Sequence, residues 1–269
     1  MEPASSHRVR SGDAEIAYWV LGEGRPVVLL HPFPVHHEFW LPVAEALATR
    51  YRLILPDLRG HGASDVGEGP ARMEKHAADI VRVMDDAEVG RAPIIGVSIG
   101  GYAMFELWRK YRGRIGAMGL CNTKAPADSD EARSGRLQAA KDVLERGTDP
   151  FFETMVQRVF GRTTRETRPD LVQGALRMMR KMSPDAVAQV QRGMAERPDS
   201  VEILKTISVP ALLITGEEDP MTGVNEAQLM HQHIAGSEVR VIPRAGHYSP
   251  WEQPEFAHRL LRQFLDAVI

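Results

Sequence analysis

The stretch IIGVSIGGY, residues 95–103, places a serine between two glycines where an apolar run ends and a helical pattern begins. If a strand ends at Ser98 and a helix starts at once, the hydroxyl projects from the carboxyl edge of a sheet on a tight, strained turn. Gly96 and Gly100 fit because a Cβ at either position would clash where strand and helix pass. The first N–H groups of the helix would face negative charge developing beside the serine. The stretch predicts an exposed nucleophile, although a glycine-rich turn with Ser98 as an ordinary N-cap gives the same pattern.

Short apolar runs recur along the chain and alternate with segments of helical spacing. Each run predicts a strand buried on both faces. These runs cover residues 25–31, 51–57, 92–98, 115–122 and 209–216, and the clearest helical segments cover 38–50, 76–89 and 101–111. Residues 7–21 mix polar and apolar positions and predict the opening strands. Such alternation is typical of an α/β fold with a parallel sheet.

The alternation stops between about residues 125 and 205. Four helical segments follow one another there, separated by Gly, Pro and polar breaks, and the strand pattern resumes at Val209. Ser183 followed by Pro184 predicts a helix start, with the serine as N-cap and proline in the first turn. We therefore expect a core formed by residues 1–124 and 206–269, with residues 125–205 as a helical insertion.

A serine hydroxyl becomes a good nucleophile only when a neighbouring base removes its proton and a carboxylate orients that base. His247 follows the last predicted strand directly and is the only histidine on a strand-end loop downstream of an acidic turn. That acidic turn follows the strand LLITG, and we expect its Asp219 to orient His247. Glu218 is the nearest alternative for the acid, and Asp128 is a more distant one.

Five stretches in this order resemble the α/β-hydrolase fold superfamily of serine hydrolases, and the resemblance covers almost the whole chain. The stretches are LLHPFP (29–34), LPDLRGHGASD (55–65), GVSIGG (96–101), GEEDP (216–220) and AGHYSPWEQPEFAHRLLRQFL (245–265). Their serine, acid and histidine also come in the order of that superfamily. The resemblance implies a mostly parallel central sheet of about eight strands flanked by helices, with the insertion as a cap. Within the superfamily, the chain is similar to compact bacterial esterases, 3-oxoadipate enol-lactonases, cofactor-free perhydrolases and carbon–carbon bond hydrolases.

The resemblance also assigns an oxyanion hole to two backbone N–H groups, those of Ile99 and Phe33. Pro32 stands where the family commonly has glycine, which stiffens the loop and removes one N–H but leaves the donor at Phe33. The same HPFP stretch is explained equally by a rigid turn that holds His31 as a packing residue. Both interpretations are compatible.

The stretch DLRGHGAS is expected to serve structure rather than chemistry. Its Asp57, Arg59 and His61 are polar residues that follow a buried strand, so they predict a hydrogen-bonded loop beneath the site. Candidate residues for the substrate pocket are Trp40, Met178 and Met182, the two methionines having helical spacing. Packing in the core and on the apolar underside of the cap explains these three residues as well.

The insertion carries an excess of positive charge between residues 156 and 182. Arginine and lysine occur seven times in this range, at 158, 162, 165, 168, 177, 180 and 181, against two acids at 166 and 170. Such an excess suits an acidic substrate, because guanidinium groups bind carboxylates in a bidentate manner. A solvated helix face is the simpler interpretation and the favoured one.

Composition narrows the class of protein further. The 269 residues are 43% hydrophobic and 26% charged with a formal net charge of -3, which suits one globular unit with no general attraction to nucleic acid or an anionic membrane surface. Cys121 is the single cysteine, so neither an intramolecular disulfide nor a thiolate zinc site is possible. The sequence shows no signal-peptide core and no apolar run of ~18 residues, so we expect a cytoplasmic protein. No motif requires a metal or an organic cofactor, and the expected partner is a small molecule.

Together these features predict a serine hydrolase that cleaves a carboxylic ester or lactone through an acyl-enzyme on Ser98. A perhydrolase (haloperoxidase), with peroxide in place of water, and a carbon–carbon bond hydrolase would use the same three residues. From another class, a ligand receptor or signalling protein on this scaffold would combine tight binding with very slow turnover. The sequence leaves the oligomeric state open.

Overall fold

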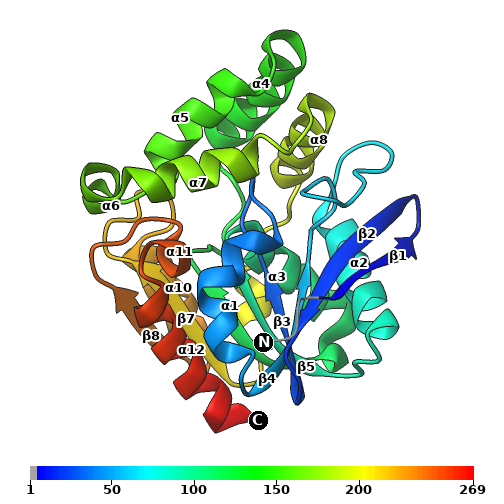
Figure 1. Ribbon diagram of the computed structural model, residues 1–269, viewed down its shortest axis with the longest axis vertical. Helices are drawn as coiled ribbons and strands as arrows, with labels where there is room; N and C mark the ends of the chain where they lie inside the picture. Colours follow the sequence, from blue (N-terminus) through cyan, green and yellow to red (C-terminus); the bar gives the residue numbers. More distant parts are fainter. Residues whose placement is uncertain (1–4) are drawn as a thin grey trace.

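A computed structural model describes residues 5–269, which form an eight-stranded sheet with helices packed on both faces (Figure 1). Residues 1–4 of the expected core lie outside the described residues. The strands are β1 (Ser5–Ser11), β2 (Ala14–Leu21), β3 (Arg25–Leu30), β4 (Tyr51–Pro56), β5 (Ala92–Val97), β6 (Ile115–Cys121), β7 (Ala211–Gly216) and β8 (Glu238–Ile242). Every predicted apolar run is a strand, so the expected alternation is confirmed.

The strand order is β1-β2-β4-β3-β5-β6-β7-β8. Strand β2 pairs antiparallel with both β1 and β4. The other neighbours pair parallel, so the six strands β4, β3, β5, β6, β7 and β8 run in the same direction. The carboxyl ends of those six strands therefore lie at one edge of the sheet. Since β5 and β7 are buried along their whole length, the polar residues that follow them are the first to reach that edge.

Helices that follow the strands cover the sheet. Helix α1 packs against α12 and lies in front of the sheet in Figure 1, while α2 packs against α3 behind it. The core helices are η1 (His37–Trp40), α1 (Leu41–Leu47), α2 (Met73–Asp86), α3 (Ile99–Tyr111), η2 (Arg112–Arg114), α10 (Val224–His233), α11 (Ser249–Glu252) and α12 (Pro254–Val268). The α3 helix begins directly after Ser98, as the opening stretch predicts.

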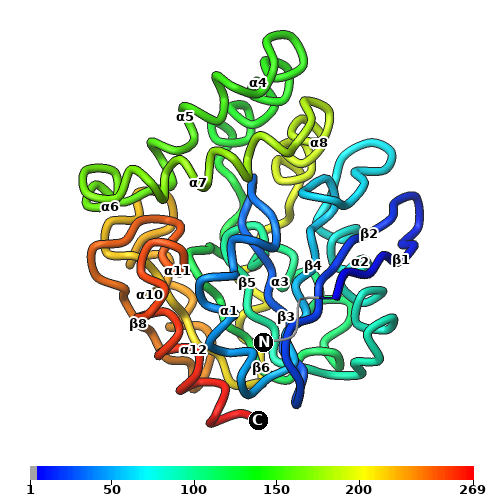
Figure 2. Tube along the Cα trace, in the orientation of Figure 1, coloured from blue at the N-terminus to red at the C-terminus, as the bar shows by residue number. Residues whose placement is uncertain are grey.

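The helices between β6 and β7 form a separate layer, at the top of Figures 1 and 2. They are α4 (Asp130–Arg146), α5 (Asp149–Val159), α6 (Arg162–Thr167), α7 (Pro169–Met179) and α8 (Pro184–Ala195), followed by the short α9 (Val201–Leu204). We call α4–α8, residues 130–195, the cap. The Ser183 hydroxyl accepts a hydrogen bond from Ala186 N at the start of α8, so the predicted N-cap is confirmed. The sequence pattern did not predict α6 and α9, which are only 6 and 4 residues long.

The cap contacts the core near the carboxyl edge of the sheet. The ring of Phe33, on the loop after β3, lies edge to face with Phe151 of α5, with 6.0 Å between ring centroids. The backbone N–H of His247, on the loop after β8, donates to Val159 O at the end of α5. Substrate space is therefore expected between these two layers. Among residues 5–269, no helix has the length and apolar character needed to cross a membrane.

Candidate active site

Ser98 occupies the strained turn that the sequence predicts. Its φ is 54° and its ψ is -112°, a conformation that costs free energy in any residue with a Cβ. The surrounding structure holds it there, since the Ser98 carbonyl accepts hydrogen bonds from Gly101 N (2.9 Å) and from the Thr123 hydroxyl (2.9 Å). The residue as a whole is 8% exposed, so it is nearly buried. Ser98 thus lies at the carboxyl end of β5 and at the N-terminus of α3.

The two glycines beside Ser98 permit two different close approaches. A Cβ on Gly96 would lie 2.6 Å from the backbone carbon of Gly100, which is the predicted crowding of strand against helix. A Cβ on Gly100 would lie 2.8 Å from Leu30 O, so this glycine makes room for the neighbouring strand β3. Real Cβ contacts are not this short, so both positions require glycine.

His247 and Asp219 come together from the loops after β8 and β7. Nδ1 of His247 lies 3.0 Å from Asp219 Oδ2 and 3.0 Å from the Thr222 hydroxyl. An ionised carboxylate only accepts hydrogen bonds, so Nδ1 carries the proton and Nε2 is left with a free lone pair. This is the tautomer in which a histidine can take a proton from a serine.

Asp219 accepts hydrogen bonds from more donors than His247 alone. Asn122 Nδ2 (2.9 Å) and the Thr222 hydroxyl (2.8 Å) bind Oδ2, and Met221 N (2.8 Å) binds Oδ1. Burial alone raises the pKa of Asp219, but the charge of His247 and these hydrogen bonds outweigh it and hold the pKa below its usual value. The carboxylate therefore stays ionised beside His247.

Sequence reasoning missed Asn122 and Thr222. Asn122 follows β6 directly, at the same edge as Ser98, and has a positive φ of 44°. Its side chain also donates to Gly246 O (3.2 Å), so it joins the acid to the loop of His247. A polar residue that ends an apolar run was the available signal for Asn122, whereas nothing local distinguishes Thr222 from other threonines.

The two alternative acids, Glu218 and Asp128, bind residues other than His247. Glu218 accepts hydrogen bonds from the backbone N–H and the hydroxyl of Thr163, so it ties the core to α6 of the cap. Asp128 pairs with Arg136 and Arg197, and burial and these two arginines together leave its pKa lowered to about 2. Neither carboxylate hydrogen-bonds His247 in the described residues. The geometry thus singles out Asp219 as the partner of His247.

The loop that carries His247 is fastened to the cap. Val159 O accepts hydrogen bonds from the backbone N–H of His247 (2.8 Å) and of Tyr248 (3.2 Å). The buried Glu252 accepts one from Gly161 N (2.9 Å) and one from Gly246 N (2.8 Å), which joins the end of α5 to the same loop. The cap therefore contributes to the position of the histidine as well as covering the site.

The two predicted oxyanion donors remain free. Ile99 is the first residue of α3, and neither its N–H nor that of Phe33 donates a hydrogen bond within residues 5–269. The Tyr248 hydroxyl donates to Phe33 O (2.8 Å), which fixes the Phe33 loop against the loop of His247. His31 is buried and accepts a hydrogen bond from Leu58 N (2.8 Å), so the structural interpretation of HPFP is confirmed.

The loop after β4 has the predicted hydrogen-bonded structure. Asp57 accepts from His37 N (2.8 Å) and Ala63 N (2.8 Å), and Arg59 donates to both carboxylate oxygens of Asp79 (2.9 and 2.7 Å). Asp57, Arg59 and His61 are all buried. They support the loop from beneath, as expected.

Buried neutral histidines should make the protein sensitive to acid. Burial lowers the pKa of His61 to about 4 and that of His76 to about 3, against about 6.5 in an unfolded chain. Below pH 6.5 the unfolded chain therefore binds more protons than the folded protein, and stability falls as the pH falls. Between pH 6.5 and pH 4.5 these two histidines should together lower the free energy of unfolding by about 5 kcal/mol, since each costs about 1.4 kcal/mol per pH unit. His31 and His36, whose pKa values burial also lowers, act in the same direction. Urea unfolding at the two pH values measures this loss of stability.

A substitution distinguishes the contribution of a buried histidine to this pH dependence from the contributions of other titrating groups. His76→Leu should remove about 2 kcal/mol of that pH dependence between pH 6.5 and pH 4.5, whereas His7→Gln on the exposed strand β1 should leave it unchanged. Equal pH dependence in wild type and His76→Leu would contradict a buried neutral His76.

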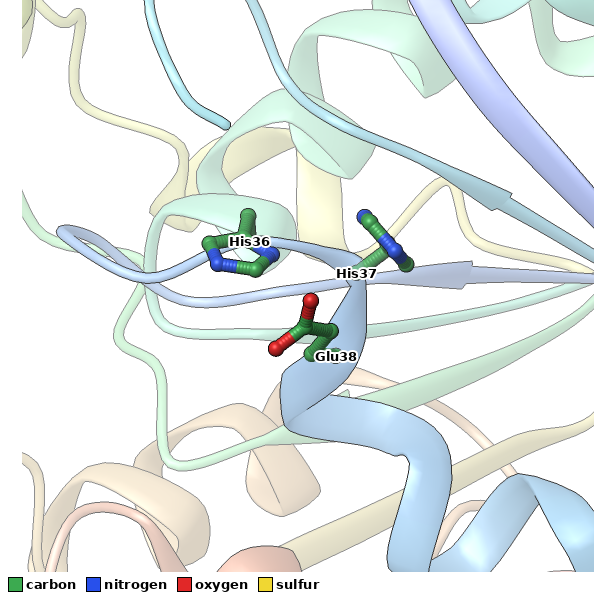
Figure 3. Close-up of side chains that lie close together, drawn as sticks. All are labelled: His36, His37 and Glu38. Carbon is green, nitrogen blue, oxygen red and sulfur yellow. The ribbon is translucent and has the colours of Figure 1, made fainter. Parts of the chain in front are cut away.

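One group of side chains has the composition of a metal site. His36, His37 and Glu38 lie together at the start of η1, with one potential ligand atom from each within 4.8 Å of the others (Figure 3). A tetrahedral zinc ion needs ligand atoms about 3.5 Å apart, given bond lengths of about 2.1 Å. His37 Nδ1 is hydrogen-bonded to Asp57 Oδ1 (2.8 Å), and Glu38 is paired with Lys181 (3.2 Å). These contacts account for His37 and Glu38, so we assign no ligand role to the group.

A cavity of about 710 Å³ lies between the cap and the core. We call it the cap cavity. Its lining includes Thr222, which contacts both His247 and Asp219, and Tyr102, one turn after Ser98 on α3. The cavity is therefore beside the predicted catalytic residues.

The three predicted pocket residues do not line the cap cavity. Trp40 is fully buried and packs edge to face against Phe39, with 5.4 Å between ring centroids. Met178 and Met182 are each 4% exposed and belong to the apolar core cluster. The cavity instead takes Phe151 and Met155 from α5. For all three residues the structure supports the packing interpretation.

The seven cations between residues 156 and 182 divide into two groups. Arg158 and Arg165 line the cap cavity. The other five are exposed: Arg168, Arg180 and Lys181 pair with Asp170, Asp149 and Glu38, and Arg162 and Arg177 are exposed as well. The favoured interpretation as a solvated face thus holds for these five, whereas Arg158 and Arg165 also face the cavity.

Comparison with known proteins gives concordant results. A family model described as alpha/beta hydrolase fold matches residues 25–254. The chain is 29% identical over 245 residues to 3-oxoadipate enol-lactonase 2 of Acinetobacter baylyi, covering 90% of each protein. Among solved structures, it resembles a thermophilic esterase from Thermogutta terrifontis with a TM-score of 0.95, 35% identity and coverage of 98% of this chain and 99% of that one. An enol-lactonase from Burkholderia xenovorans LB400 superposes with a TM-score of 0.90, 25% identity and coverage of 97% and 100%.

Proposed function

The chain belongs to the alpha/beta hydrolase fold family, and we infer from this premise that it is a hydrolase of ester or lactone bonds in small molecules. Relatives named as esterases and enol-lactonases support the reaction class. The observation that carries the proposal for this chain is the hydrogen bond of 3.0 Å from His247 to the ionised Asp219, at the same sheet edge as the strained turn of Ser98. We propose these three residues as the catalytic triad.

The proposed reaction begins with proton transfer from the Ser98 hydroxyl to His247 Nε2 while the oxygen attacks the carbonyl carbon. The N–H groups of Ile99 and Phe33 would hold the negative oxygen of the tetrahedral intermediate. His247 then returns the proton to the leaving alcohol, and an acyl-enzyme on Ser98 remains. Water, activated by the same histidine, releases the acid. Throughout, Asp219 keeps Nδ1 protonated and stabilises the positive charge that His247 acquires.

The partner is proposed to be a small molecule, because the cap cavity of about 710 Å³ has the size of a small-molecule site and is lined by Thr222, which contacts His247 and Asp219. A cytoplasmic location is also proposed. It is supported by Cys121, the single cysteine of the chain, which is free, so the chain forms no intramolecular disulfide.

Steady-state hydrolysis of p-nitrophenyl esters, from acetate to octanoate, together with a simple lactone tests the proposed function. We expect turnover of short esters, with kcat/KM falling once the acyl chain exceeds the space above Ser98. Peracid formation from hydrogen peroxide, measured in parallel, reports the perhydrolase alternative. Inactivity with every ester and lactone would overturn the proposal and leave a carbon–carbon hydrolase or a receptor.

A further inference from the structure

The charge around the cap cavity is strongly unequal. Its lining contains the four cations Lys124, Arg136, Arg158 and Arg165, and a single acid, Asp128. A concave cavity concentrates the field of such charges more than a flat surface does. The four cations differ in whether a carboxylate neutralises their charge.

Asp128 neutralises one end of the cavity only. Its carboxylate pairs with Arg136, with the buried Arg197 (3.0 Å) and with Lys124 (3.5 Å). Three cations already share this carboxylate, so it does not pair with Arg158 or Arg165. Asp128 therefore belongs to a satisfied ion-pair cluster at the start of α4.

Arg158 and Arg165 have no carboxylate partner within residues 5–269. Arg165 Nη1 donates to Gln157 O (2.8 Å) and Phe160 O (2.7 Å), the backbone at the end of α5. These bonds fix its guanidinium group while leaving other N–H groups of the fork free. Arg158 has no hydrogen-bond partner in the described residues, and it also lines an adjoining cavity of about 290 Å³ that contains Asp142.

The backbone that carries Arg158 is fixed relative to the predicted triad. The next residue, Val159, accepts the hydrogen bond from His247 N (2.8 Å). Thr222 lines the same cavity as the two arginines and contacts Asp219 (2.8 Å). A ligand in the cavity can thus lie between the arginines and the reacting groups.

We propose that Arg158 and Arg165 bind a carboxylate of the substrate, so that the preferred substrate is an ester or lactone that also carries an acid group. This inference rests on the proposed function and adds the class of substrate. Two planar guanidinium groups match the geometry of a carboxylate. Arg165 supplies a donor that backbone carbonyls hold in place, and Arg158, which is exposed and has no partner in the described residues, supplies the second.

A pair of substrates tests the proposal. Kinetics are measured with p-nitrophenyl butyrate and with mono-p-nitrophenyl succinate, which differ mainly in the terminal carboxylate. The ratio of kcat/KM for the anionic to the neutral ester should fall about 10-fold to 100-fold in Arg158→Gln, the range of a charge-assisted hydrogen bond. Arg177→Gln, on the exposed surface of α7, is the matched control and should leave the ratio unchanged.

A binding measurement is independent of turnover. Titration calorimetry of glutarate into the wild type and into Arg158→Gln should show at least about 10-fold weaker binding in the variant. Binding that depends on Arg158, in a protein that hydrolyses no ester, would support the anion site and overturn the proposed function. Hydrolysis of the neutral ester, with a substrate ratio and a glutarate affinity that Arg158→Gln does not change, would overturn the anion site alone.

Discussion

Ser98→Ala is expected to lower kcat for p-nitrophenyl butyrate by at least about 10,000-fold, with little change in melting temperature. The hydroxyl is the proposed nucleophile, and removal of a triad nucleophile leaves only the contribution of the oxyanion hole and binding. The backbone at this position has a φ of 54° with either side chain, so serine and alanine carry similar strain. Steady-state assays at high enzyme concentration measure the residual rate.

Ser6→Ala, on the exposed strand β1, is the matched control and should keep full activity. A fluorophosphonate probe adds a direct readout, because it should label wild type at Ser98 and fail to label Ser98→Ala. Retention of more than a few per cent of wild-type activity in Ser98→Ala would contradict the acyl-enzyme mechanism. A second active serine or a general-base mechanism would then have to be sought.

Asp219→Asn is expected to lower kcat by about 1,000-fold to 10,000-fold while KM changes little. An amide at this position can donate to Nδ1, which favours the tautomer of His247 with its proton on Nε2, where it cannot accept the serine proton. The amide also loses the charge that stabilises protonated His247. The other side-chain oxygen can still accept the hydrogen bonds from Met221 N and Thr222 N, which hold the side chain in place, so the variant should fold.

Glu218→Gln distinguishes the two acids of the turn. Glu218 contacts Thr163 of the cap, and loss of one hydrogen bond should change kcat/KM by less than about 10-fold. Equal losses in Asp219→Asn and Glu218→Gln would contradict the assignment of Asp219. A large loss in Glu218→Gln alone would indicate that the link between core and cap limits the reaction.

The sequence alone was sufficient for the strand-to-helix turn at Ser98 and for the alternation around it. These features depend on local chemistry: Gly96 and Gly100 leave room for the turn, and continuous apolar runs form strands buried on both faces. His247 and Asp219 could be named because each follows a strand, and the ends of parallel strands meet at one edge. Helices α6 and α9 were missed because they are too short to show a repeating pattern.

The tertiary structure decided which polar groups actually meet. Asn122 and Thr222 reach Asp219 from β6 and from the turn after β7, and no local pattern records that convergence. Among the arginines of residues 156–182, only Arg158 and Arg165 line the cavity, because the way α5 and α6 pack on the core determines which side of each helix faces it. Trp40 packs in the core for the same kind of reason. Local sequence sets the turns and the strands, whereas the composition of a cavity depends on side chains that are brought together from distant segments.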